Sequence, residues 1–132
     1  MSATERPMLK PRPVYLDLPR IRLPLPGIVS ILHRVSGAAL FLFGIPLLLA
    51  GAGMSLASPE SFAAMTAWVA NPLVKLVLLG FAWAYLHHFC AGIRYLLLDL
   101  HQGIELPAAR RSSVVVLVAS VALTLIVGVR LW

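Results

Sequence analysis

The chain has 132 residues, of which 60% are hydrophobic and only 12% are charged, and its mean hydropathy is +0.90. Charged residues make up about a quarter of a soluble globular domain. This composition therefore excludes a soluble domain and indicates an integral membrane protein. The net charge is +6, but the basic residues lie where they would set the orientation of a membrane protein. We therefore expect no nucleic-acid partner.

Three apolar segments follow an N-terminal arm. They cover about residues 27–50, 72–98 and 113–132, and each is long enough to cross a hydrocarbon core of roughly 30 Å as a helix. The arm, residues 1–26, holds six of the ten prolines and is expected to be extended, without the apolar run of a secretory signal peptide. The prediction is an all-α membrane protein with three transmembrane helices, an extended cytoplasmic arm and a single domain, 1–132.

The basic residues indicate how the helices are oriented. The loop expected at 51–71 contains no Lys or Arg, whereas the arm and the loop at 99–112 contain most of them. By the positive-inside rule the N-terminus is cytoplasmic and the loop 51–71 is outside, which places Trp68 and Trp132 at the outer interface. An arm with Glu5 and many prolines is a poor import sequence, so a bacterial plasma membrane is favoured over the mitochondrial inner membrane.

The start of the first span carries polar residues at helical spacing. Ser30, His33, Arg34 and Gly37 lie at i, i+3, i+4 and i+7, so they share one face near the cytoplasmic edge. Two interpretations stay open. One is an arginine that reaches lipid phosphates beside a helix-start serine, and the other is a binding site for a polar headgroup.

The most informative residue is His88, in the middle of the second span. It lies ~16 Å before Asp99 and so near the membrane midplane, where an ionisable side chain usually faces a cavity, a bundle interior or a cofactor. Gly92, Tyr95 and Asp99 follow it on the same face, and Gly92 leaves room for a bulky planar group held by the imidazole. His87 points about 100° away, so we expect no role for it at the same metal.

If that group is haem with two axial histidines, the second histidine must come from another chain. The other candidate, His33, is expected ~14 Å or more from His88 in depth, whereas two axial nitrogens on one iron lie only about 4 Å apart. His33, Arg34 and Arg94 are expected where propionates directed toward the cytoplasm would end, and they would pair with them.

The remaining features are interpreted as structural. The third span contains small residues that suit close helix packing, namely Ala119, Ser120, Ala122 and Gly128. In the first span, Gly44 and Pro46 predict a kink. The single cysteine, Cys90, is expected to pack within the bundle.

Three segments of this short chain resemble those of one family. They are RPVYLDL at 12–18, SILHRVSG at 30–37 and HFCAGIRYLLLD at 88–99, and they are similar to the cytochrome b membrane-anchor subunit of succinate dehydrogenase, respiratory complex II. The resemblance covers nearly the whole chain. The chain departs from the family at Tyr95, because the family often has a second histidine directly after GIR. A tyrosine there can still donate a hydrogen bond, but it cannot take a role that requires an imidazole.

The resemblance implies a set of roles. His88 matches the axial ligand of haem b, whose second histidine comes from a second membrane-anchor subunit. Ser30 and Arg34 match residues of the ubiquinone site beside the iron–sulfur subunit. His33 and Arg34 match positions near the haem propionates, and Asp99 matches the acidic residue that closes the second helix. The chain would be a subunit, not catalytic alone, of an enzyme whose flavoprotein oxidises succinate.

Two alternatives stay open. One is the anchor of a quinol:fumarate reductase, because the direction of the reaction depends on flavin and cluster potentials that belong to other subunits. The other is a small transporter or assembly protein without a cofactor. The absence of Asp and Glu from the interiors of the spans argues against a transporter.

Overall fold

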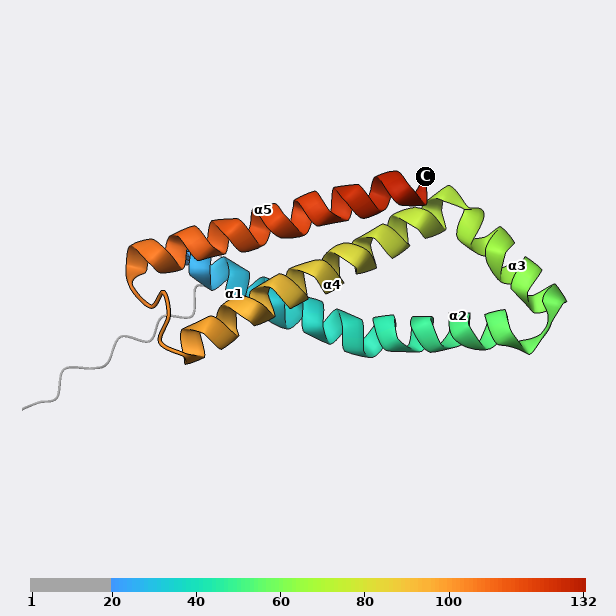
Figure 1. The fold of residues 1–132 in the computed structure, drawn as a ribbon, viewed down its shortest axis with the longest axis horizontal. Helices are drawn as coiled ribbons and strands as arrows, with labels where there is room; N and C mark the ends of the chain where they lie inside the picture. Colours follow the sequence, from blue (N-terminus) through green and yellow to red (C-terminus); the bar gives the residue numbers. More distant parts are fainter. Residues whose placement is uncertain (1–19) are drawn as a thin grey trace, which may run out of the picture.

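The computed structural model describes residues 20–132, and the expected extended arm falls largely outside the described residues. Every regular element within residues 20–132 is helical, so the all-α fold class is confirmed. In chain order the main elements are α1 (Leu25–Ala39), the π-helical turn η2 (Leu40–Gly44), α2 (Ile45–Ala57), α3 (Pro59–Ala70), α4 (Pro72–Asp99) and α5 (Leu106–Leu131) (Figure 1).

Three helical stretches are long and apolar enough to cross a membrane, as predicted. They are Leu25–Ala57, which joins α1, η2 and α2, then Pro72–Asp99 and Leu106–Leu131. Each extends beyond the range expected from the apolar pattern. α4 packs against both α1 and α5, and α1 also contacts α5, so α4 is the central helix of the bundle.

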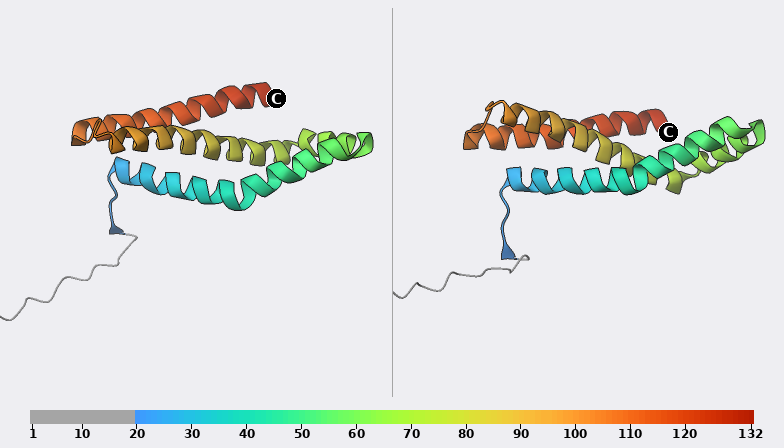
Figure 2. Two further views of the ribbon diagram at one scale, coloured as in Figure 1. Left: turned by 60° about the horizontal axis from the view of Figure 1, so that its bottom comes forward. Right: turned by 90° about the horizontal axis from the view of Figure 1, so that it is seen from below.

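The first span bends where η2 interrupts the regular helix (Figure 2). In this turn the Ile45 N–H donates to the Leu40 carbonyl, five residues back rather than four. Pro46 follows directly and has no N–H to continue the regular pattern. The kink predicted from Gly44 and Pro46 is therefore confirmed, and its form is a π-helical turn.

The region 51–71, expected to be a loop, is largely helical. α2 continues to Ala57, and α3 begins directly after Ser58. The Ser58 hydroxyl accepts a hydrogen bond from the Ser61 N–H at 3.1 Å, and the Ser61 hydroxyl accepts one from the Ser58 N–H at 3.2 Å. This reciprocal cap satisfies two N–H groups at the helix start, and Pro59 has the backbone angle that a first helical position requires.

The interior of the bundle is built from small and polar side chains. The buried apolar residues within 20–132 are only Val29, Ala84, Ala91 and Val116, while the buried polar ones include Ser113, Ser120 and Thr124 of α5. Each of these three hydroxyls donates to a carbonyl three or four residues earlier in its own helix. They therefore act at the interface through their small size, which allows α5 to approach α4 closely.

The small residues predicted for helix packing divide into two groups. Ser120 is fully buried, and Gly128 faces Leu79 of α4, since a Cβ at position 128 would lie 3.4 Å from a Leu79 methyl group. Ala122, by contrast, is exposed. The packing prediction is confirmed within this chain for Ser120 and Gly128 on the inner face of α5, and for Ala122 on the outer face it stays a prediction.

Both ends of the α4–α5 pair are fixed by polar contacts. α4 ends in a Schellman motif, in which the N–H groups of His101 and Gln102 donate to the carbonyls of Leu98 and Leu97 at 2.9 Å. His101 takes the left-handed conformation, with φ of 59°, that this motif requires. At the opposite end, Lys75 at the start of α4 donates to the carbonyl of Leu131 at 2.9 Å.

Candidate functional site

His88 lies on the face of α4 that meets α1, where two groups of α1 hold its ring. Its Nδ1 atom lies 3.0 Å from the main-chain carbonyl oxygen of His33 and 3.3 Å from the hydroxyl oxygen of Ser36. A carbonyl oxygen only accepts, so Nδ1 carries the proton and donates it, and the lone pair of the imidazole lies on Nε2. Nε2 makes no hydrogen bond with any residue in 20–132 and is not enclosed by the protein.

The same turn of α1 contains Gly37, and the His88 ring lies directly against it. A Cβ built on residue 37 would stand 2.7 Å from Cε1 and 3.1 Å from Nδ1 of His88, closer than side chains normally approach. Ser36 is buried, and its hydroxyl also donates to the His33 carbonyl at 3.0 Å. Ser36 is not among the predicted site residues, although its position three residues after His33 is the sequence signal for this contact.

The side chain of His33 lies over the ring of His88. Their ring centroids are 4.1 Å apart and the planes differ by 11°. The Tyr95 ring is tilted against the His33 ring, with centroids 5.0 Å apart. A Cβ at Gly92 would lie 3.9 Å from His33 Nε2, with no other neighbour within 4 Å. Below, these residues with Ser36 and Gly37 are called the His33–His88 cluster. The shared face predicted for His88, Gly92 and Tyr95 is confirmed.

The expected separation of His33 and His88 in depth is wrong. The estimate placed His33 close to the cytoplasmic edge, but eight residues of α1 precede it, so that His33 is ~12 Å from the start of the helix at Leu25. His88 is ~16 Å inside the opposite end of the antiparallel α4. The two residues therefore lie at nearly the same level, which brings their rings into contact.

His87, the neighbour of His88 on α4, is fully buried. Its ring stacks on Trp83, with centroids 5.3 Å apart, and neither ring nitrogen has a hydrogen-bond partner among the described residues. An enclosed ring of this kind has no open position beside it. The two adjacent histidines therefore differ in access: His87 is sealed in the bundle, whereas Nε2 of His88 is not enclosed.

The two residues predicted at the cytoplasmic rim, Ser30 and Arg34, lie on α1 one turn apart. Ser30 is half-buried and Arg34 is exposed. Ser30 and Arg34 make no hydrogen bond or ion pair with any residue in 20–132, so a hydroxyl donor and a guanidinium remain available at this edge of the helix. His33 lies between them in sequence but turns toward α4.

Arg94 is buried and makes its hydrogen bonds to α5. Its Nε donates to the Ser112 hydroxyl at 2.9 Å and its Nη2 to the Ala109 carbonyl at 3.4 Å. Arg94 therefore joins α4 to the first turns of α5. Its Nη1 group makes no hydrogen bond with the described residues and is not enclosed.

Two further residues of the predicted α4 face have no polar partner among residues 20–132. The Tyr95 hydroxyl is enclosed and makes no hydrogen bond, while the Arg94 guanidinium lies 5.4 Å above the Tyr95 ring. Asp99 is exposed at the end of α4 and makes no ion pair there.

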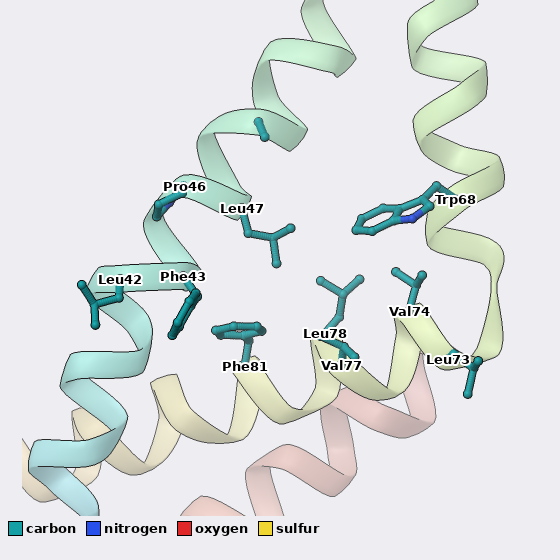
Figure 3. A pocket seen from close by; sticks show the side chains of 11 residues that line it. Leu42, Phe43, Pro46, Leu47, Trp68, Leu73, Val74, Val77, Leu78 and Phe81 are labelled. Atoms are coloured by element: carbon teal, nitrogen blue, oxygen red, sulfur yellow. The ribbon is translucent and has the colours of Figure 1, made fainter.

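An apolar groove is lined by residues of α2, α3 and α4 and by part of η2. It consists of two adjoining cavities of about 660 and 760 Å³ that share Leu47, Trp68, Leu78 and Phe81. Trp68 points from α3 into the space between α2 and α4 (Figure 3). No charged side chain lines this groove, and its larger part reaches Leu40 and Tyr85, within one helical turn of Gly37 and His88. The spacing of the sequence gives no sign of it, because it forms only when α3 folds back.

Comparison with known proteins identifies the family of this chain. The family model for the succinate dehydrogenase/fumarate reductase transmembrane subunit matches residues 8–127. The chain is 36% identical over 115 residues to the succinate dehydrogenase cytochrome b556 subunit of Paracoccus denitrificans, which covers 87% of this chain and 88% of that protein.

Two other relatives show the same likeness. The cytochrome b556 subunit of succinate dehydrogenase from Coxiella burnetii is 38% identical over 122 residues, covering 92% of this chain and 97% of the relative. A membrane subunit of succinate dehydrogenase 2 from Mycobacterium tuberculosis is 34% identical over 113 residues, covering 81% of each. With its three apolar spans, this chain is a multi-pass membrane protein and belongs to the transmembrane-subunit family of succinate dehydrogenase and fumarate reductase.

Proposed function

We propose that this chain is the haem-binding, quinone-facing membrane anchor of a succinate:quinone oxidoreductase, and that His88 supplies one axial ligand to haem b. The observation that carries the proposal is the state of the His88 ring. Nδ1 donates to the His33 carbonyl, which leaves the lone pair of Nε2 free for a metal. A backbone carbonyl that accepts from the other ring nitrogen is the usual support of a metal-binding histidine, because it fixes the ring and raises its basicity.

The residues around His88, in and beside the His33–His88 cluster, fit a planar cofactor. Gly92 presents no side chain beside His33, and Arg34 and His33 supply cationic or hydrogen-bonding groups at the cytoplasmic side for two propionates. The free Nη1 of Arg94 is the group that would reach a carboxylate, while its other nitrogens stay bound to α5. When bound, haem supplies a one-electron store close to the quinone.

The second axial ligand must come from a second membrane-anchor subunit. His33 and His88 lie face to face, whereas two histidines that bind one haem direct their nitrogens at each other across the iron. His87 is sealed inside the bundle. His88 is therefore the one haem ligand that we assign to this chain.

The quinone site is proposed at the rim formed by Ser30 and Arg34. The Ser30 hydroxyl donates a hydrogen bond to a quinone carbonyl and so sets the position of the ring. The Arg34 guanidinium stabilises the negative charge that develops on the quinone oxygens as electrons arrive from the iron–sulfur subunit. Neither side chain makes a hydrogen bond within residues 20–132 that would have to be broken first.

The wider assembly contains the iron–sulfur subunit, the flavoprotein subunit, the second anchor and membrane lipid. The relatives are named as subunits of succinate dehydrogenase, which favours succinate oxidation over fumarate reduction, and ubiquinone as the acceptor is part of the proposal. Membership of the family also favours an electron-transfer complex over a transporter or assembly protein.

The same comparison bears on location. The relatives are bacterial, and the region 51–71 lacks Lys and Arg while Arg110 and Arg111 follow α4. These features support a bacterial plasma membrane with the N-terminus in the cytoplasm.

The test is a dithionite-reduced minus oxidised absorption spectrum of the complex, purified from its native membrane with and without His88→Ala. We expect the sharp band of a low-spin b-type haem together with flavin in the parent complex, and loss of that band with flavin retained in the variant. A full haem band in the His88→Ala complex would overturn the ligand assignment. Flavin without haem in the parent complex would show an anchor that carries no haem.

A further inference from the structure

We propose that Gly37 is a positioning residue for His88: its missing side chain lets the imidazole reach the His33 carbonyl, and this contact presents Nε2 to the haem iron. The inference rests on the proposed role of His88 as an axial ligand. It assigns a reason to one glycine among the several in the chain.

The contacts at Gly37 differ from those at the other glycines of the same span. A Cβ at Gly37 would stand 2.7 Å from Cε1 and 3.1 Å from Nδ1 of His88. A Cβ at Gly53, on the same continuous helix, would have no neighbour within 4 Å. Ordinary contact begins at 3.4 Å, so a methyl group at position 37 must displace the ring by several tenths of an ångström.

The ring has little freedom to yield. Nδ1 is bound at 3.0 Å to the His33 carbonyl and the ring of His33 covers one face at 4.1 Å. A methyl group at residue 37 lies against the edge that carries Cε1 and Nδ1, the same edge that makes the hydrogen bond. The added methyl group therefore either breaks the Nδ1–H···O bond or pushes α1 away from α4. In both cases Nε2 loses its fixed direction.

The experiment compares Gly37→Ala with Gly53→Ala in the complete complex isolated from native membranes. The readouts are the haem-to-flavin ratio, the low-spin electron paramagnetic resonance signal of the oxidised haem, and the rate at which haem transfers to added apomyoglobin. Loss of the hydrogen bond that supports a metal-binding histidine usually weakens metal binding by about 10- to 100-fold, so we expect haem transfer from Gly37→Ala to be faster by roughly that factor. The Gly53→Ala complex should match the parent complex.

A second comparison is used if the Gly37→Ala complex fails to assemble. The double variant Gly37→Ala/His88→Ala removes the ring that the methyl group meets. If the double variant assembles as well as His88→Ala alone, the methyl group acts through the His88 ring, as proposed. If the double variant fails as Gly37→Ala does, the glycine serves helix packing and the proposal is overturned.

The outcomes also separate this inference from the proposed function. A Gly37→Ala complex with the haem content, resonance signal and transfer rate of the parent overturns the positioning role, even when His88→Ala removes the haem. A His88→Ala complex that keeps its haem overturns the ligand assignment itself, whatever Gly37→Ala does.

Discussion

The imidazole rings of His33 and His88 are stacked, with centroids 4.1 Å apart and planes within 11° of parallel. Their side chains come from antiparallel helices and meet at the same depth, but it is the main-chain carbonyl of His33, and not its ring, that holds His88. This division of roles makes His33 replaceable in a way that His88 is not.

We predict that His33→Ala keeps the low-spin haem band. The substitution leaves the carbonyl of residue 33 in place, so the Nδ1–H of His88 retains its acceptor. The reduction potential should change, because an imidazole beside the proposed haem site is lost. A potentiometric titration followed at the haem band measures the change. Complete loss of the band, with flavin present, would show that the ring of His33 is itself required for ligation.

We predict that Arg34→Ala lowers quinone reduction but spares electron transfer to an artificial acceptor. Removing a preorganised donor from a developing oxyanion costs about 10²–10³ in rate at a buried site, and we expect a smaller loss, about tenfold or more, because Arg34 is exposed. Arg34→Lys, which keeps the charge, should retain part of the activity. A parallel fall of both activities would mean that assembly was lost.

We predict that His87→Phe leaves haem content unchanged and does not destabilise the complex. His87 is buried with both nitrogens unpaired, and an unpaired buried polar group costs about 1–3 kcal/mol that an apolar ring of similar size avoids. The phenyl ring can keep the stacking on Trp83. Thermal unfolding of the assembled complex and its haem-to-flavin ratio test this, with His87→Asn as a polar control expected to be less stable. A haem-free His87→Phe complex would contradict the separation of the two histidines.

We predict that Lys75→Met loosens the end of α5. Lys75 donates to the Leu131 carbonyl at 2.9 Å, and its ammonium lies 5.3 Å from the ring centroid of Trp132. Together these contacts contribute about 1–3 kcal/mol, since one is a charged hydrogen bond and the other a cation–π contact. Cleavage of the C-terminus by carboxypeptidase in membrane vesicles should become faster. Lys75→Arg keeps both kinds of contact and should behave like the parent protein.

The sequence predicts the large-scale architecture well, because membrane spans are set by length and hydropathy. It also predicts the inward face of α4, since His88, Gly92 and Tyr95 follow helical spacing and all three lie near His33. The helical content of 51–71 was missed, because α3 is a short helix defined by the cap at Ser58 rather than by an apolar pattern.

The rotation and shift of the helices relative to one another could not be predicted from the sequence pattern. The expected depth of His33 did not count the eight residues, ~12 Å, of α1 that precede it. The direction of Arg94 depends on α5, whose Ser112 and Ala109 receive its hydrogen bonds. Spacing along one helix fixes which residues share a face, but contacts between helices depend on their relative rotation and shift.

The π-helical turn at Leu40–Gly44 carries a consequence for how this protein can vary. A π turn contains one residue more than an α-helical turn spanning the same rise. Deletion of a single residue within this turn would remove the extra residue while both halves keep their facing, with His33 still toward α4 and Leu47 still beside α3, and Pro46 would still leave one carbonyl without an N–H partner. The turn is thus a place where the chain length can change by one without rotating the histidine-bearing segment out of register.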